Sequence, residues 1–228
     1  MATDGRNDPN SHAEYTVQFG IRFFQPLTEW LIERRPASAR GRILDFGCAD
    51  LRLARALDGI WVIDGWDEWA SAREAARRTA AQLGEPGVVF ERLEDVPTDH
   101  YDVIVLNSLF QYVAGEDQAR ELFAQVGPLL ARDASVGIVI NDAVSDGASR
   151  VVDLWDIARM AIRTQGPIEG PRFVRRAIKS GKPSVRHFND EATLTRAAAS
   201  VGLVLTRHPR NLSTFTRRAT FILRHAEG

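Results

Sequence analysis

The sequence contains a single cysteine, Cys48, among 228 residues. One cysteine excludes a disulfide within the chain and agrees with the reducing conditions of the cytoplasm. The five histidines are scattered, and together with Cys48 they form no spacing typical of a metal site. With 44% hydrophobic residues, a chain of this length buries a core without such cross-links. We therefore expect a cytoplasmic globular protein that binds no metal.

The sequence also has very few lysines, and it lacks a large net charge and long apolar runs. Lys179 and Lys182 are the only lysines, and acidic and basic residues balance to a net charge of −1. This balance argues against a nucleic-acid-binding protein. No run approaches the ~20 apolar residues of a membrane-spanning helix. The polar opening "MATDGRNDPN" lacks the basic start and apolar run of a signal peptide. The sequence thus predicts no nucleic-acid partner and no membrane span.

The first forty residues divide into two parts. Residues 1–13 are polar and rich in Asn and Asp, which predicts a disordered tail. Residues 14–40 carry aromatic and aliphatic side chains at helical spacing, interrupted by Pro26. We expect an N-terminal helical cap there, followed by one domain over 41–228.

In that domain, short apolar segments alternate with helical ones. Strands are expected at 42–46, 60–66, 88–92, 101–107 and 135–140, and helices at 52–57, 70–83, 118–130 and 190–201. Too little chain separates 203–207 from 220–224 for a helical crossover, so these two strands should pair antiparallel. The pattern predicts a doubly wound α/β fold. Its mostly parallel sheet, of the seven-strand type, has helices on both faces and ends in a C-terminal antiparallel hairpin.

A long segment over about 144–188 interrupts the alternation. It holds an amphipathic helix pattern, and residues 150–187 contain nine Arg or Lys against three acidic residues. Loops of this length in compact domains are commonly lids or binding elements. We interpret the segment as a helical, basic insertion.

Three features should meet where the parallel strands end, which is where open α/β sheets bind ligands. The loop "DFGCAD" follows the first strand and turns its N–H groups toward that edge. Asp67 ends the second strand, 20 residues after Gly47, where an acid accepts hydrogen bonds from ribose hydroxyls. "ERLEDVP" follows the third, with Leu93 placed to contact a flat ring.

The order "ILDFGCAD", "GWDEW", "LEDVP" and "YDVIVLNSLFQYV" resembles the class I S-adenosylmethionine-dependent methyltransferases. The resemblance implies S-adenosylmethionine as the cofactor. Asp45 and Gly47 would surround its amino-acid end, and Asp67 would hold its ribose. The full set of cofactor-binding residues that the resemblance implies is Asp45, Gly47, Cys48, Ala49, Trp66, Asp67, Glu68, Leu93, Glu94, Asn107 and Ser108. Within this set, Leu93 and Glu94 would border the adenine, and Asn107 and Ser108 would lie near the sulfonium.

The sequence departs from this family's pattern at two places. Ala49 and Leu51 replace the second and third loop glycines, which allow positive φ and close approach of a ligand. Leu51 is expected to place a branched side chain where the methionine end of the cofactor should lie. Arg92 also occupies the position at which the family often has an acid after the third strand.

The leading hypothesis is methyl transfer to an oxygen or nitrogen of a small, natural-product-like molecule. The aromatic N-terminal segment and the basic insertion favour an acceptor with an apolar body and an anionic group. His187 and Tyr15 are the candidates for a catalytic base. A homodimer is left open.

Two alternatives remain. Leu51 keeps open a methyltransferase-like protein that binds the cofactor without methyl transfer, or no longer binds it. The sequence disfavours a nicotinamide-dependent oxidoreductase, because Ala49 and Arg52 occupy two glycine positions of G-x-G-x-x-G.

Overall fold

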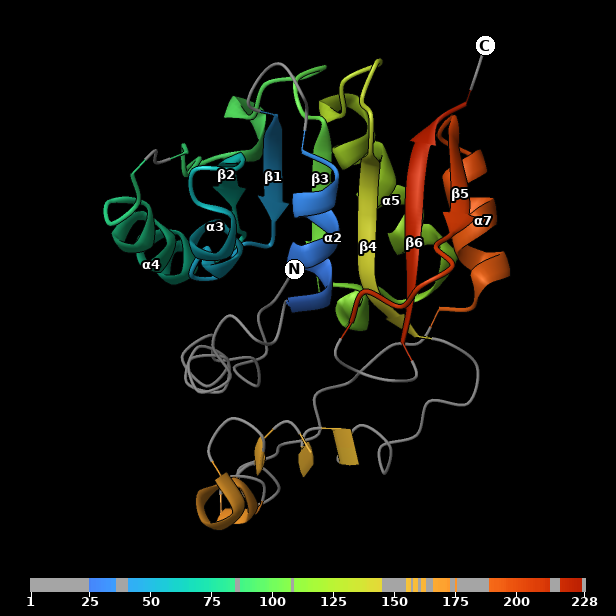
Figure 1. The fold of residues 1–228 in the computed structure, drawn as a ribbon. Helices are drawn as coiled ribbons and strands as arrows, with labels where there is room; N and C mark the ends of the chain where they lie inside the picture. The colour runs from blue at the N-terminus through green and yellow to red at the C-terminus, as the bar shows by residue number, and fades with distance from the viewer. Residues whose placement is uncertain are drawn as a thin grey trace.

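The computed structural model describes six long segments and parts of the insertion (Figure 1). The long segments are 25–35, 41–84, 87–107, 109–144, 189–213 and 218–226. In the insertion it describes 155–156, 158–159, 161–162, 166–172 and 175. Within these residues, no helix is both long and apolar enough to cross a membrane. The same residues contain no group of His, Cys, Asp or Glu arranged to hold a metal ion.

A six-stranded mixed sheet forms the centre of the described fold, in the order β2-β1-β3-β4-β6-β5. The strands are β1 (Arg42–Phe46), β2 (Val62–Trp66), β3 (Val103–Asn107), β4 (Gly137–Val144), β5 (Leu203–Arg207) and β6 (Arg218–His225). The first four strands pair in parallel, and β6 runs antiparallel to both β4 and β5. The α/β class and the antiparallel C-terminal hairpin are therefore confirmed.

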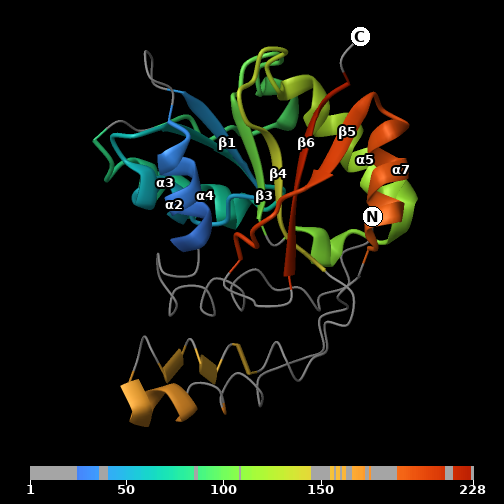
Figure 2. The same ribbon diagram turned by 45° about the vertical axis from the view of Figure 1, so that its right-hand side comes forward.

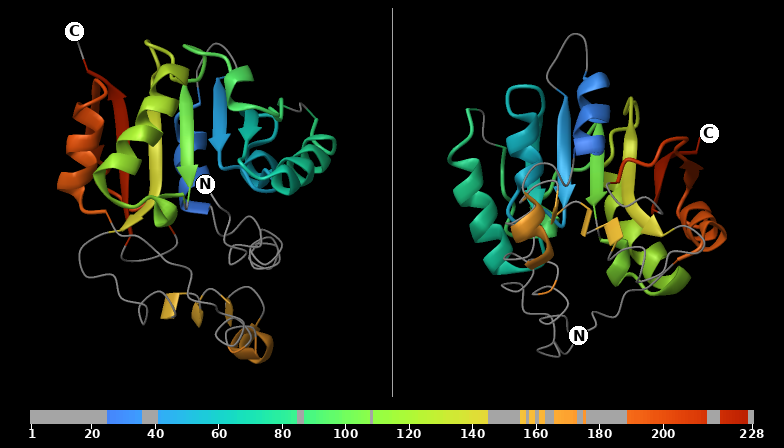
Figure 3. Two further views of the ribbon diagram at one scale, coloured as in Figure 1. Left: turned by 180° about the vertical axis from the view of Figure 1, so that it is seen from behind. Right: turned by 60° about the horizontal axis from the view of Figure 1, so that its bottom comes forward.

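Helices cover both faces of the sheet (Figures 2 and 3). The α-helices are α2 (Gln25–Glu33), α3 (Arg52–Leu57), α4 (Ala70–Ala80), α5 (Gly115–Val126) and α7 (Glu191–Ala199), with 3-10 turns η2 (Leu93–Asp95), η3 (Phe110–Tyr112) and η4 (Gly127–Leu129). Buried residues of α2, α3 and α4 form one core cluster with the sheet, and those of α5 and α7 form the other. Both faces are thus apolar, as a parallel sheet covered on both sides requires.

The expected strand at 88–92 is not present, so the seven-strand count is not confirmed. Val89 makes only an isolated parallel bridge with Gly65. The N–H of Val88 donates to the Asp64 carboxylate at 2.7 Å instead of to a neighbouring strand. The chain then turns into η2 at Leu93, so the extended stretch is too short to form a strand.

A buried carboxylate on β2 links three parts of the chain. The Asp64 side chain is completely buried and forms an ion pair with Arg42 at 2.7 Å. It also accepts hydrogen bonds from the Tyr101 hydroxyl at 3.1 Å and from the Val88 N–H. Burial and the neighbouring carboxylate raise the pKa of Tyr101, so the phenol stays protonated and donating. Asp64 therefore connects β1, β2 and the segments before β3.

We predict that Asp64→Ala destabilises the fold by about 3 kcal/mol, because it leaves the partly buried Arg42, the buried Tyr101 hydroxyl and the Val88 N–H without an acceptor. Tyr101→Phe removes only one of the donors and should cost about 1 kcal/mol. Urea unfolding of both variants measures the difference. Equal losses in the two variants would show that Asp64 does not hold this junction.

Candidate functional site

The loop between β1 and α3 is left-handed at three alternate residues. The φ angles are 81° at Gly47, 47° at Ala49 and 56° at Leu51. Only Gly47 is a glycine, so Ala49 and Leu51 adopt a conformation that L-residues with a side chain rarely take. The loop thus keeps the backbone shape of a glycine-rich loop at positions that have lost the glycine.

The Leu51 side chain does not point where the sequence led us to expect. It is completely buried in the core cluster on the α2 side of the sheet, beneath the loop. Its Cδ1 atom lies 2.8 Å from the position that a Cβ of Gly65 would occupy. The missing side chain at Gly65 on β2 therefore makes room for Leu51, which leaves the outer side of the loop without the branched side chain.

Hydrogen bonds fasten this loop to the end of β2. The N–H groups of Gly47 and Cys48 donate to the Trp66 carbonyl at 2.8 and 3.1 Å. The Ala49 N–H donates to Oδ2 of Asp67 at 3.0 Å, and the Trp69 N–H donates to Oδ1 at 2.9 Å. Asp67 is 7% exposed, so one buried carboxylate joins the β1 loop to the start of α4.

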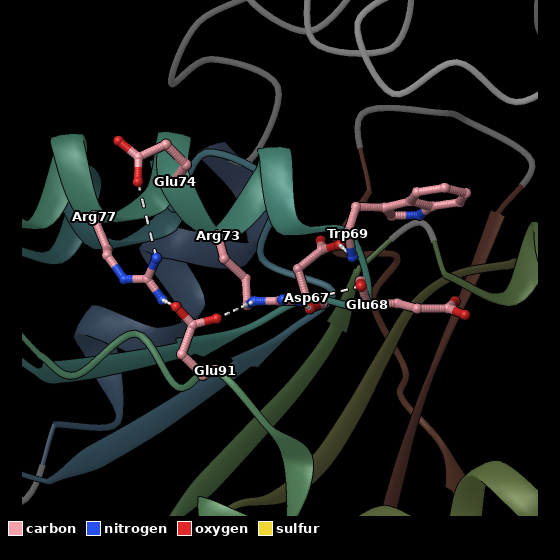
Figure 4. A network of polar contacts seen from close by, with 7 residues as sticks. All are labelled: Asp67, Glu68, Trp69, Arg73, Glu74, Arg77 and Glu91. Atoms are coloured by element: carbon pink, nitrogen blue, oxygen red, sulfur yellow. Dashed lines mark hydrogen bonds and ion pairs between the residues drawn. The ribbon is translucent and has the colours of Figure 1, made fainter.

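Arg73 on α4 holds the same corner from the other side (Figure 4). Its Nη1 donates to the carbonyl oxygens of Asp67 and Glu68 at 2.7 and 3.0 Å. Its Nε donates to Glu91 at 3.0 Å, and Arg77 binds the other oxygen of that carboxylate at 2.5 Å. Arg73 and Arg77 lower the pKa of Glu91. This clamp connects the acid-bearing turn after β2 with the segment that leads to η2.

Asp45 on β1 is a second buried carboxylate, and it differs from Asp64 in its partners. It is 7% exposed, and among the described residues no donor or cation pairs with its side chain. Burial raises its pKa to about 7, with further contributions from the nearby charges of Asp67 and Asp50. An unpaired carboxylate in such a place favours a cationic ligand group, which would replace its lost solvation.

The remaining predicted residues lie around this corner. Asn107 ends β3 and accepts a hydrogen bond from Asn141 at 3.0 Å. Leu93 packs partly buried against the core, and Glu94 is exposed and pairs with Arg92 at 3.3 Å. Trp66 and Cys48, the last two, pack against other residues of the protein. Trp66 packs against Phe46 with ring centroids 4.7 Å apart, and Cys48 is buried, which raises the pKa of its thiol.

Three predicted residues, Ser108, Tyr15 and His187, lie outside the described residues. The sequence reading missed Gly65, Arg73 and Asn141. A glycine inside a strand is a signal for close packing, so Gly65 could have been found. Arg73 and Asn141 carry no sequence signal, since each acts on a residue distant along the chain or through the backbone.

We predict that Gly65→Ala destabilises the fold by about 1–3 kcal/mol, because the added methyl group meets Leu51 and Cys48. Leu51→Ala alone should also destabilise, by about 2–5 kcal/mol. In the double variant the close contact with Leu51 is gone and only the contact with Cys48 remains, so the loss should be smaller than the sum of the two single losses. Chemical unfolding of the three variants measures this coupling, and simple additivity would contradict the packing of Leu51 against Gly65.

A second prediction concerns pH. Because folding raises the pKa of Asp45 from 3.8 to about 7, the folded state retains a proton that the unfolded state has lost between these values. Asp45 therefore destabilises the fold increasingly as the pH rises from 4 to 7. Asp45→Asn should match the wild type at pH 4 and exceed its unfolding free energy by about 4 kcal/mol at pH 8. Unfolding curves across this range measure the difference, and a difference that does not grow with pH would contradict it.

Comparison with known proteins gives the fold a context. No family model matches the sequence, and no curated protein matches it either. Solved structures do match. Magnesium protoporphyrin IX methyltransferase from Synechocystis PCC 6803, with bound SAH, has a TM-score of 0.59 at 11% identity, covering 90% of this chain and 83% of that one.

Two further structures match with longer chains of their own. An O-methyltransferase family protein from Burkholderia thailandensis gives a TM-score of 0.60 at 16% identity, covering 100% of this chain and 62% of that one. N,N-8-amino-8-demethyl-D-riboflavin dimethyltransferase from Streptomyces davawensis gives a TM-score of 0.62 at 17% identity, covering 93% of this chain and 56% of that one. The chain thus spans a little more than half of these two proteins. The protein has the Rossmann-like fold of the class I S-adenosylmethionine-dependent methyltransferases.

Proposed function

We propose that this protein is an S-adenosylmethionine-dependent methyltransferase that modifies an oxygen or nitrogen of a small molecule. The observation that carries the proposal is the corner formed by the β1 loop, Asp45 and Asp67. The loop is left-handed at 47, 49 and 51, Leu51 is turned into the core, and both aspartates are nearly buried beside it. The magnesium protoporphyrin IX methyltransferase of similar fold was crystallised with SAH and with SAM.

The groups at this corner suit the parts of S-adenosylmethionine. Its amino-acid end carries an ammonium group, and the Asp45 carboxylate lacks a cationic partner among the described residues. Asp67 uses one acceptor site of each oxygen for Ala49 and Trp69, and each carboxylate oxygen has a further lone pair for a ribose hydroxyl. Binding an ammonium beside Asp45 would lower the pKa of this carboxyl and release its proton.

In the proposed reaction the cofactor supplies an electrophilic methyl group on a positively charged sulfur. The chain's own residues supply alignment. Asp45 would bind the amino-acid end and Asp67 would hold the ribose, while Arg73 holds the turn that carries Asp67. Leu93 and Glu94 would border the adenine, and Asn107 and Ser108 would lie near the reacting sulfur. His187 and Tyr15 stay the proposed bases, and each must reach the substrate proton within hydrogen-bond distance.

We further propose an acceptor with an apolar body and an anionic group, bound under the N-terminal cap at 14–40 and the basic insertion at 144–188. The basic residues of that insertion would neutralise the anionic group. The names of the similar enzymes, which methylate a porphyrin and an aminoflavin, support a small-molecule acceptor. We also propose that the protein is located in the cytoplasm and forms a homodimer.

Calorimetry with S-adenosylmethionine, S-adenosylhomocysteine and NAD tests the proposed cofactor. The wild type should bind the first two and not NAD. Asp67→Asn should weaken binding by at least tenfold, because a neutral amide loses acceptors for the ribose and for the loop N–H groups. Asp117→Asn, at an exposed position in the first turn of α5, is the matched control and should bind as the wild type does.

The outcomes separate the three function classes. Binding of NAD alone would favour an oxidoreductase and overturn the proposal. Binding of S-adenosylmethionine without methyl transfer to any acidic or neutral small acceptor would favour a binding protein. Absence of binding to all three would favour a methyltransferase-like fold that has lost its cofactor. Transfer only to cationic or macromolecular acceptors would overturn the proposed substrate class.

A further inference from the structure

A chain of buried polar groups links the end of β3 to the C-terminal hairpin. Asn107 and Asn141 are register partners on β3 and β4, and Asn141 Nδ2 donates to Asn107 Oδ1 at 3.0 Å. Thr220 on β6 donates its hydroxyl to Asn141 Oδ1 at 3.1 Å. Asn141 and Thr220 are 2% and 1% exposed. Strands β3, β4 and β6 lie side by side in the sheet (Figure 1), so this chain crosses three strands.

The backbone of Leu212 orients the Asn141 amide within this chain of polar groups. Its N–H, which can only donate, gives a 3.0 Å hydrogen bond to Thr220 Oγ1, which leaves the Thr220 proton for Asn141 Oδ1. Its carbonyl, which can only accept, receives Asn141 Nδ2 at 3.4 Å. Asn141 therefore presents an N–H to Asn107, and Asn107 must present its oxygen in return.

This orientation also determines which way the Nδ2 group of Asn107 points. With Oδ1 facing Asn141, the Nδ2 group is left to donate elsewhere, and none of the described residues accepts from it. Side chains alternate along each strand, and Val105 and Val139 belong to the core cluster on the α2 side. Asn107, Asn141 and Asp45 therefore share this face, with Asn107 at the carboxyl end of β3.

We propose that Asn141 is a positioning residue that holds Asn107 as a hydrogen-bond donor beside the reacting sulfur. The substrate group that contacts Asn107 must then accept a hydrogen bond, as an oxygen with a free lone pair does, for example that of a carboxylate. This inference rests on the proposed function and narrows its substrate class. An Asn107 held the opposite way would present a carbonyl oxygen and would suit a cationic acceptor instead.

The test compares the affinities of S-adenosylmethionine and S-adenosylhomocysteine, which differ in the positive charge on sulfur. Asn107→Asp still accepts from Asn141 but places a carboxylate oxygen where the wild type has an N–H. In this variant the ratio of the affinity for S-adenosylmethionine to that for S-adenosylhomocysteine should rise about tenfold. Asn141→Asp can only accept, so Asn107 turns its Nδ2 inward and its oxygen outward. The ratio should shift in the same direction by about threefold.

Thr220→Val is the control for a purely structural role. It removes a buried hydrogen bond and lowers the melting temperature, yet it leaves the Leu212 carbonyl to orient Asn141. Its affinity ratio should equal that of the wild type. Should Asn141→Asp fail to fold, Asn141→Ser replaces it, because Asn107 is then free to turn and the ratio shifts the same way. In the Asn107→Asp background, Asn141→Ser should have no effect on the ratio, because a carboxylate has an oxygen on both sides.

The outcomes distinguish this proposal from the proposed function. Wild-type protein that binds neither ligand overturns both. Wild-type protein that binds both, with the ratio unmoved in a folded Asn141 variant, overturns the role of Asn141 alone. A shift of equal size in Thr220→Val also overturns the role of Asn141, because the chain of buried polar groups would then serve only the stability of the fold.

Discussion

The candidate site depends on the junction between the β1 loop and the end of β2. The Asp67 carboxylate accepts the N–H of Ala49 on one side and that of Trp69 on the other, so it connects two segments that follow different strands. Beneath it, Leu51 fills the space left by Gly65. The hydrogen bonds and the packing together hold two non-glycine residues in the left-handed region. Strain of this kind persists only where the surrounding structure over-determines it, and it is concentrated at functional sites.

Two buried aspartates differ in how the fold compensates their charge. Asp64 has a cation, a hydroxyl and a backbone N–H, so its charge is compensated within the fold. Asp45 lies on the neighbouring strand and has the charges of Asp67 and Asp50 nearby without a described cation of its own. The first stabilises the junction of three segments. The second destabilises the unliganded protein above pH 4, and the proposed ligand would remove that cost.

The C-terminal hairpin contributes to more than the closure of the sheet. Through Leu212 and Thr220, it reaches Asn141 and then Asn107 at the end of β3. At the opposite edge of the sheet, Arg73 fixes the turn after β2 and the segment before η2. The two ends of the proposed cofactor site are thus held by different parts of the chain. Asn141 lies 34 residues from Asn107, whereas Arg73 lies six residues from Asp67 and holds its turn through backbone carbonyls.

The sequence by itself determined the alternation of strands and helices, the antiparallel hairpin and the placing of Asp45, Gly47 and Asp67 at one edge. These follow from local patterns, because apolar periodicity defines the elements and parallel strands bring their ends together. Only the tertiary structure decided that residues 88–92 form a bridge rather than a strand, since the competing partner is the side chain of Asp64. It also decided that Leu51 points into the core, which requires Gly65 on another strand. Contacts between residues distant along the chain leave no periodic signal, so the sequence predicts the edge of the site but not the groups that orient it.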